Sequence, residues 1–581
     1  MKRYGLLFTL CLVSCALAAQ ETKGSLSGFM KEELTDFDQF ISKENQAFIN
    51  FLREPWKQLD AQKPVVKRKK PEPVRPVVYD SVRSPKRKTP VQLPIEEIID
   101  LTTEEGKQRP VVRVTDVDDI TFEDEPVIVQ KQGDKPVVVV RETRKEETPE
   151  EETPEQESPE QAEKKKEKRP VVIVKEVTKE TPRKEDTKRP VVIVKETPKQ
   201  EKPKQEKPKQ EKPKPEAPKQ DPSKQSGTPI TFAGQTFRIS NALNRVCRLR
   251  SLDENSIADA YEALCRANYK PLLTDCARIR QSLSLNDWGY FQLLRQAANT
   301  LCAGANESTV LQLFLLNESG YRTKIARKSD EQKLLLFLSP DCKLYGRPYL
   351  TLGGQTYYYI DGTEPCRFYM CQRDFSRSAN PVSMALRKAP AFKGSAVTHT
   401  HKAQGSAASV NAPVPESLME FYRSYPQCDY SVYFNAPVNP GVEAALLSAL
   451  QPLIQGKSEA QAANLLINFV QTAFDYKTDP DQFGYEKPFF VEELFYYPFS
   501  DCEDRSMLYS YLVRKLLGLD VVLLDYPEHI ATAVAFKGNV DGDYVLVGNR
   551  KYIVCDPTYI GAPIGQAMPQ YRTVKAGIIK N

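Results

Sequence analysis

Residues 63–225 constrain this chain more than any other feature, because a segment of this composition cannot build a hydrophobic core. Pro, Lys and Glu dominate it, aromatic residues are few, and it accounts for the excess of proline in a chain that has 44. So little apolar surface cannot offset the entropy lost on folding. We therefore predict a disordered, repeat-rich tether here. About 350 residues follow position 226, which suffices for two domains with cores of their own.

A short unit, Lys/Arg-Pro-Val-Val, recurs along this tether. Its copies begin at Lys63, Arg75, Arg109, Lys135, Arg169 and Arg189. Prolines at this density favour an extended polyproline conformation. The valines offer a strand that can add to the edge of a partner's sheet, so a cell-envelope partner for the tether is one expectation. The alternative is a solvated spacer without a partner.

The N-terminus has the layout of a secretory signal peptide. A basic pair precedes an apolar run over residues 6–17 that ends in Ala-Leu-Ala, so residues 1–18 are assigned to the signal. A rival pattern, Leu12-Val13-Ser14-Cys15, resembles a lipobox and predicts a lipoprotein anchored through Cys15. Both patterns predict export, to the periplasm, the outer membrane surface or the medium. No later apolar run reaches the ~20 residues that a membrane helix needs, so the mature chain is expected to have no transmembrane segment.

Charge and cysteine pattern exclude several classes of function. The 82 basic and 77 acidic residues give a net charge of +5, which is too balanced for a nucleic-acid footprint, so no nucleic-acid partner is expected. The 12 cysteines are irregularly spaced without a CxxC pair, which argues against a zinc site. No calcium loop of the DxDxDG kind is present either. The sequence therefore predicts no metal and no cofactor.

Residues 19–62 form the first segment outside the tether that has a regular pattern. Apolar residues recur at helical spacing between Phe29 and Trp56, which predicts an amphipathic helix. An isolated helix of this kind needs a surface on which to bury its apolar face. We expect it to dock on the C-terminal domains or on another chain. The alternative is a frayed segment that follows the signal peptide.

The chain after the tether divides into two domains and a connection. Residues 226–375 read as an α+β accessory domain that opens with a hairpin, and residues 376–430 as a linker rich in Ser, Ala and Pro. Residues 431–581 alternate first helical and then strand patterns. The predicted fold class is therefore α+β, with helices packed on an antiparallel sheet in the C-terminal domain.

A candidate nucleophile lies at the start of a helix near the C-terminus. Ser500 or Asp501 can cap this helix, which places Cys502 in its first turn. The unpaired N–H groups and the helix dipole stabilise a thiolate at that position. Glu503, Asp504 and Arg505 follow, and we interpret them as ordinary polar residues of a first turn with a local ion pair.

A base and an orienting group follow in the same domain. Of the three histidines, His399 and His401 fall in the predicted linker, where we expect them to be exposed, whereas His529 opens a strand. Asp556 ends a later strand and precedes a proline. His529 and Asp556 can meet only if their strands are antiparallel neighbours, with strand 543–548 on the outer side. Under that condition Cys502, His529 and Asp556 form a candidate catalytic triad.

The order of these motifs resembles the transglutaminase-like superfamily, whose core also occurs in papain-like cysteine enzymes. Cys502 begins a helix, His529 opens a strand and Asp-Pro-Thr at Asp556 closes another, while Tyr-Pro-Phe-Ser-Asp-Cys-Glu-Asp-Arg resembles exported bacterial members. The resemblance implies a Cys-His-Asp enzyme that acts on protein or peptide amides through a thioester, released by water or by an amine. Many relatives use an upstream Trp to stabilise the oxyanion. The domain has none, and Tyr497 is the candidate in its place.

Two alternatives accompany this interpretation. The first is a non-catalytic cell-envelope binding or scaffold protein that retains a vestigial transglutaminase-like domain. The second concerns residues 280–371, whose pattern resembles a degenerate copy of the same fold. In that copy Asn306 stands near the position of Cys502, and Asp361 near that of Asp556. An unrelated α+β domain with similar periodicity is the other explanation of this segment.

Overall fold

The computed structural model describes residues 26–66, 76–81, 89–100, 130–131, 136–137 and 227–580. The predicted signal peptide and most of the predicted tether lie outside these residues. The chain divides into two units, one made of residues 1–115 and 222–581 and the other of residues 116–221. In the second unit the described residues are the short antiparallel strands β4 (Gln130–Lys131) and β5 (Pro136–Val137).

The first lobe opens with a hairpin and continues with helices. Strands β6 (Thr228–Phe232) and β7 (Gln235–Ile239) form the hairpin that the sequence predicts. The helices after it are α4 (Glu254–Arg266), α5 (Lys270–Ser282), α6 (Asp287–Leu301) and α7 (Ala305–Glu318). Side chains that favour helix starts fix two of them: Asp253 accepts from the N–H of Ser256, and Asn286 from that of Gly289.

A six-stranded sheet completes the first lobe. Its strands are β8 (Thr323–Lys328), β9 (Leu334–Leu338), β10 (Tyr349–Leu352), β11 (Gln355–Tyr359), β12 (Arg367–Met370) and, from the N-terminal part of the chain, β1 (Lys57–Asp60). They are antiparallel, in the order β1-β12-β8-β9-β11-β10. The mixed α+β class that the sequence predicts is therefore observed in this lobe.

The second lobe begins inside the segment that the sequence predicts to be a linker, so that prediction is wrong. Strands β13 (Ala396–Lys402) and β14 (Ser409–Pro415) form a hairpin, and α8 (Glu416–Arg423) follows it directly. Val410, Ala412 and Val414 alternate with polar or exposed residues and are fully buried. The small residues and prolines that indicate a linker belong here to one strand with a buried face.

The remaining elements of the second lobe surround a second six-stranded sheet. The helices are α9 (Tyr430–Phe434), α10 (Pro440–Ile454), α11 (Glu459–Thr472), α12 (Asp479–Phe483) and α13 (Cys502–Leu512), with short turns η2 (Val491–Phe495), η3 (Val513–Leu517) and η4 (Pro569–Tyr571). The sheet strands are β17 (Asp520–Asp525), β18 (Ile530–Ala535), β19 (Tyr544–Val547), β20 (Arg550–Cys555), β22 (Ala576–Lys580) and β3 (Ile95–Asp100). Two short parallel pairs lie outside it: β15 (Asp475–Tyr476) with β16 (Phe499–Ser500), and β2 (Val77–Val78) with β21 (Tyr559–Ile560).

The two sheets have the same strand order. The second sheet runs β19-β20-β18-β17-β22-β3, and the first, read in the same direction, runs β10-β11-β9-β8-β12-β1. Helix α7 precedes β8 as α13 precedes β17, and each lobe opens with a hairpin. The edge strands differ, because β1 is antiparallel to β12 whereas β3 is parallel to β22. A repeated fold requires this correspondence between the two lobes. The matching hairpins extend the similarity beyond residues 280–371, to the part of the first lobe before residue 280.

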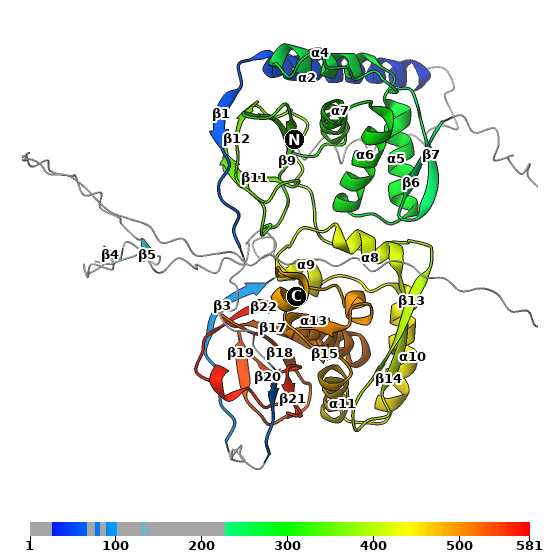
Figure 1. Ribbon diagram of the computed structural model, residues 1–581. Helices are drawn as coiled ribbons and strands as arrows, with labels where there is room; N and C mark the ends of the chain where they lie inside the picture. The colour runs from blue at the N-terminus through cyan, green and yellow to red at the C-terminus, as the bar shows by residue number, and fades with distance from the viewer. Residues whose placement is uncertain are drawn as a thin grey trace, which may run out of the picture. The chain divides into compact units, whose positions relative to one another are not determined.

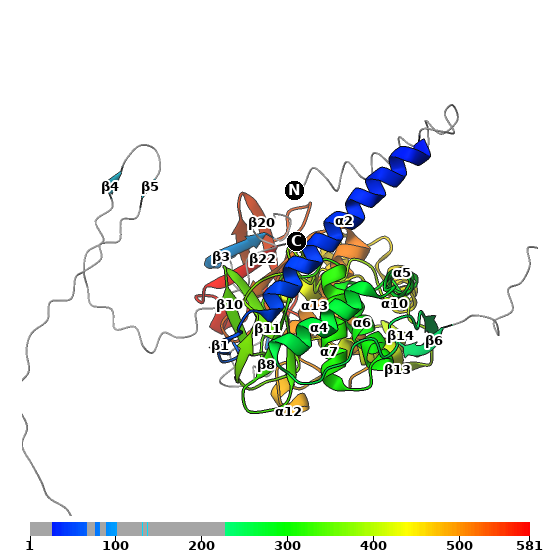
Figure 2. The same cartoon turned by 90° about the horizontal axis from the view of Figure 1, so that it is seen from above.

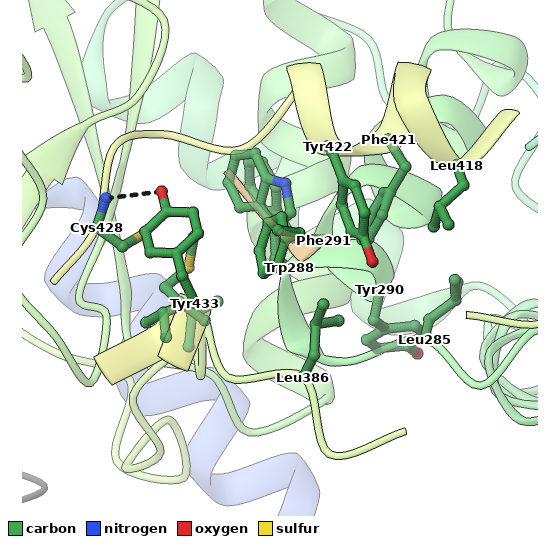
Figure 3. Close-up of a cluster of buried hydrophobic side chains, with 14 of the residues drawn as sticks. Leu285, Trp288, Tyr290, Phe291, Leu386, Leu418, Phe421, Tyr422, Cys428 and Tyr433 are labelled. Carbon is green, nitrogen blue, oxygen red and sulfur yellow. Dashed lines mark hydrogen bonds between the residues drawn. The ribbon is translucent and has the colours of Figure 1, made fainter. Parts of the chain in front are cut away.

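Two features join the N-terminal helix and the lobes. Helix α2 (Leu26–Arg53) lies beside α4 (Figures 1 and 2), where Leu52 is buried and Arg53 pairs with Asp259 and Glu262. The amphipathic helix therefore docks on the folded part of its own chain. Figure 3 shows the aromatic cluster that α6 and the α8–α9 region share, in which Trp288 stacks on Phe291 and donates its Nε1–H to Ser424 at 3.1 Å. Within the described part of the chain, no helix combines the length and the apolar character needed to cross a membrane.

Candidate active site

Cys502 is the first residue of α13, as the sequence predicts. Asp501 is the N-cap, and its backbone N–H donates to Asp504 Oδ2 at 3.0 Å, which closes a reciprocal capping box. The thiol of Cys502 is fully buried. It therefore lies at the positive end of the helix dipole, out of water, where the field of the first turn acts on it with little screening.

His529 and Asp556 meet at one end of the second sheet. Strand β20 is antiparallel to β18 with Thr532 opposite Cys555, and β19 lies on the outer side of β20. This order is the condition that the sequence sets for the two residues to meet, and it is confirmed. His529 Nε2 lies 2.9 Å from Asp556 Oδ2, and both side chains are buried.

The first turn of α13 lies against the start of β18. Ser506, one turn after Cys502 on the same helix face, donates its hydroxyl to the carbonyl of Ile530 at 3.1 Å. Ile530 is the residue after His529, so this bond joins the helix that begins at Cys502 to the start of the strand that follows His529. Nδ1 of His529 is buried and has no hydrogen-bond partner among the residues that the structure describes. The imidazole is thus held by the carboxylate through Nε2, while Nδ1 stays available for a proton.

The loop after Asp556 is fixed by a glutamine from α11. Gln471 donates its amide to three carbonyls, those of Asp556, Tyr559 and Ala562, at 2.7–3.1 Å, and accepts from the N–H of Gly561 at 3.1 Å. Asp556 Oδ1 also accepts from the N–H of Thr558 at 2.9 Å. The carboxylate is therefore positioned by its own loop and not by His529 alone.

Two tyrosines enclose the imidazole. Tyr571 of η4 stacks on His529 with ring centroids 4.9 Å apart, and Tyr526 stacks on Tyr571 at 4.8 Å. Burial and the nearby Asp556 raise the pKa of Tyr526 above its ordinary value, so it stays neutral. Cys502, His529 and Asp556 are all 3% exposed or less. A substrate can reach the triad only after this cover has moved.

Buried carboxylates on the other side of Cys502 are the largest departure from expectation. The thiol donates to Glu503 Oε2 at 3.0 Å, and Glu503, Asp504 and Asp479 are all buried. Burial and then the charge of Glu503 raise the pKa of Asp504 to about 8. Burial and the neighbouring acids raise the pKa of Asp479 as well. A carboxylate beside the thiol favours its protonated form, which opposes the helix dipole.

Arg505 is also not the surface residue that we expected. Its guanidinium is buried and donates to the carbonyls of Phe474 at 2.7 Å and Gln471 at 3.4 Å, and to Ser500 Oγ at 3.3 Å. The predicted local ion pair is therefore replaced by bonds that tie the approach to α13 to the end of α11. The unbroken run of polar residues before an apolar helix was the available signal for this network.

Among the described residues, two groups of side chains have donor atoms close enough to hold a metal ion. They are Asp501, Cys502 and Glu503, and Asp479, Glu486 and Glu503, each with its atoms within 4.8 Å of one another. Sulfur with carboxylates suits a transition metal, and three carboxylates suit a hard cation. Glu503 belongs to both groups, so both cannot be filled through the same oxygen. No spacing pattern in the sequence predicts either group.

Tyr497, the oxyanion candidate, contacts residues outside the triad, and its role at the oxyanion stays a prediction. Its hydroxyl lies 3.4 Å from Arg423 Nε, and its ring packs against Phe483 and Phe489. The N–H groups of the first turn of α13 are the donors that remain beside Cys502 for an oxyanion. His401 differs from expectation too, because its ring stacks on Phe474 at 4.7 Å and burial lowers its pKa, whereas His399 is exposed.

The first lobe has no equivalent of the triad among its described residues. Asn306 lies at the start of α7, as Cys502 does in α13, and its side chain bonds to the chain at the start of β9: Oδ1 accepts from the N–H of Leu334 at 2.8 Å and Nδ2 donates to Gln332 O at 3.1 Å. Asp361 instead pairs with Arg295. At the corresponding end of the first sheet, the side-chain amide of Asn306 therefore stands where the second lobe has the thiol of Cys502.

No protein-family model, no curated protein and no solved structure with which the chain was compared matches it.

Proposed function

We propose that this protein is an exported cysteine enzyme of the transglutaminase-like class, which acts on protein or peptide amide bonds. The observation that carries the proposal is the 2.9 Å contact between His529 Nε2 and Asp556 Oδ2, at the sheet end against which the first turn of α13 packs. A thiol at a helix start, an imidazole and a buried carboxylate are the parts of a nucleophilic triad.

The proposed reaction is acyl transfer. Nδ1 of His529 takes the proton of Cys502, and the thiolate attacks the amide carbonyl. The N–H groups of the first turn of α13 stabilise the oxyanion. His529 then gives the proton to the leaving amine, while Asp556 holds Nε2 and supports the imidazolium. A thioester on Cys502 remains, and water or a second amine releases it as an acid or as a new amide.

The enclosure of the triad supports a latent resting form. Tyr571 covers His529, and the thiol of Cys502 is bonded to Glu503. We propose that substrate binding displaces the cover and frees the thiol from the carboxylate. The same enclosure is the observation that favours the second candidate function, a non-catalytic envelope-binding protein whose site is vestigial.

Four full-length proteins distinguish these two functions. The native chain, Cys502→Ala, His529→Gln and a control, Cys276→Ala, are incubated with a peptide library and a primary-amine probe, and the products are read by mass spectrometry. Cys276 is a fully buried cysteine of α5 outside the site. Loss of product in the Cys502 and His529 variants alone supports the enzyme. Equal product from all four, or none from any, overturns it.

Export and the role of the tether belong to the same proposal. We propose cleavage after residue 18, or lipidation at Cys15, and delivery of the folded lobes to a cell envelope or beyond it. The N-terminal sequence and intact mass of the protein purified from its natural host test this directly. A mature chain that begins at Met1 contradicts it.

A further inference from the structure

The first Lys/Arg-Pro-Val-Val unit lies on the first lobe. Gln62, just before it, exchanges backbone hydrogen bonds with Tyr349 of β10, and the carbonyl of Val65 accepts from the N–H of Gly346 at 2.8 Å. Pro64 and Val65 are half-buried, whereas Val66 is 61% exposed. The unit is thus held through its main chain and through its first valine.

The second unit lies on the second lobe in the same manner. Val77 and Val78 pair in parallel with Tyr559 and Ile560 of β21, and the N–H of Tyr79 donates to Ile560 O at 2.7 Å. Pro76 and Val77 are half-buried, and Val78 is 71% exposed. Tyr79 packs edge-to-face on Tyr559 with ring centroids 5.5 Å apart.

The two units therefore present the same pattern, in which the proline and the first valine face the protein and the second valine faces solvent. Main-chain hydrogen bonds do not depend on side-chain identity, and the inward residues are those that all six units share. The contacts of the proline and the valines do not distinguish the docked unit from the four others, whereas Tyr79, which packs on Tyr559, follows the unit at Arg75 alone. Only two residue pairs join β2 to β21, so the docked unit is held by few bonds.

We propose that β21 and its loop form a binding site for the Arg-Pro-Val-Val unit, and that units from a second copy of this chain exchange with the resident one. The occupants from the second copy are the identical units that begin at Arg109, Arg169 and Arg189. This inference does not depend on the proposed catalysis. It gives the tether a specific role, which is to link copies of the protein when they are crowded at one surface.

Competition within the chain controls this exchange. The resident unit is covalently attached, so its effective concentration exceeds that of a free peptide in dilute solution. A ligand that needs an empty site has an apparent dissociation constant equal to its intrinsic dissociation constant divided by the fraction of molecules whose site is empty. Loosening the resident unit must therefore strengthen binding of an added unit, which is the signature that the experiment seeks.

Fluorescence anisotropy tests the site with a labelled peptide of residues 169–176 and a scrambled peptide of the same composition. The full-length Val77→Asp variant loosens the inward valine, and the full-length Val78→Asp variant is the matched control because that side chain is exposed. Every protein in this comparison, the native one included, also carries Val111→Asp, Val171→Asp and Val191→Asp, so that no other Arg-Pro-Val-Val unit of the same chain can fill the site. If the site is empty in about a tenth of native molecules, the peptide binds Val77→Asp about tenfold more tightly than the native chain. Val78→Asp behaves as native, and the scrambled peptide binds none of them. Equal binding of both peptides, or no gain in Val77→Asp, overturns the proposal.

Sedimentation velocity tests the second copy, in a Cys502→Ala background that removes any cross-linking. Val77→Asp is expected to associate with rising concentration, and the further changes Val111→Asp, Val171→Asp and Val191→Asp are expected to abolish that association. Thermal unfolding of each variant shows whether it folds. Association that persists without Val111, Val171 and Val191 refutes the second copy as the occupant.

Discussion

Replacing Asp556 with Asn removes the charge beside His529 and keeps the size of the side chain. Asp556 makes two contacts at 2.9 Å, one from Oδ2 to His529 Nε2 and one from Oδ1, which accepts from the N–H of Thr558. An amide has one oxygen and cannot accept at both places. With that oxygen on Thr558, its NH₂ faces Nε2, and the neutral imidazole must carry its proton on Nδ1. In that tautomer His529 cannot take the proton of Cys502.

The size of the effect follows from the opposite orientation of the amide. Turning its oxygen to His529 restores the productive tautomer but points NH₂ at the N–H of Thr558, and a buried donor left unpaired costs about 1–3 kcal/mol. A free-energy difference of that size corresponds to a factor of about 5–150. We therefore expect kcat/KM at pH 7 to fall by about 5- to 150-fold from the tautomer alone, with activity still above that of Cys502→Ala.

The assay is the rate of product formation from whichever peptide the mass-spectrometric screen identifies. Asp520→Asn is the matched control, because its carboxylate pairs with Arg550 at the surface and is 64% exposed. Such pairs contribute ~0–1 kcal/mol to stability and nothing to the site. Unchanged kcat/KM in Asp556→Asn, or an equal change in Asp520→Asn, refutes the role assigned to Asp556.

Three further perturbations have defined outcomes. Gln471→Leu leaves buried carbonyls of the 556–562 loop without their donor, so the free energy of unfolding should drop by about 1–3 kcal/mol and kcat should fall, measured by urea denaturation and by the same assay. Tyr571→Ala uncovers His529 and should raise the rate at which iodoacetamide labels Cys502, whereas Tyr571→Phe keeps the stacked ring and should not. The pKa of Asp504 is raised from 3.8 to about 8, so the folded state binds the extra proton; stability is full below about pH 4 and is lost as pH rises to about 8. Asp504→Asn should flatten that part of the pH dependence of urea unfolding.

Each of these expectations has an opposite outcome. Normal stability and activity in Gln471→Leu would mean that Asp556 is positioned without its loop. Equal labelling of the Ala and Phe variants at Tyr571 would mean that access to Cys502 is limited elsewhere. A stability that rises between pH 4 and 8, or a slope that Asp504→Asn leaves unchanged, would show that this carboxyl is ionised in the folded state.

The sequence predicted those parts of the fold that depend on local rules. The hairpin that opens residues 226–375 and the helix that begins at Cys502 agree with β6–β7 and α13, because turn residues, caps and hydrophobic period define them. The chemistry itself predicted the order of the strands around β20. His529 and Asp556 can touch only if a later strand inserts beside β18, and they do touch.

What the sequence missed depends on long-range packing. The hairpin of β13 and β14 is built from small residues and prolines, whose burial depends on α10 and not on their own hydrophobicity. Val77 and Val78 lie within a segment whose composition indicates no hydrophobic core, yet they pair with the strand β21. Glu503 and Asp504 follow the pattern of an exposed first turn, and only the structure shows that the turn is buried.

The pH dependence of Cys502 alkylation tests the central claim most directly, because it reports on the nucleophile without requiring a known substrate. The rate is followed by peptide mass spectrometry in the Tyr571→Ala protein, with and without His529→Gln. The account predicts that Cys502 reacts well below the ordinary thiol pKa of ~8.5 and that His529→Gln moves its profile to higher pH. Identical profiles in the two proteins would contradict a Cys502–His529 pair and leave the triad as a structural remnant.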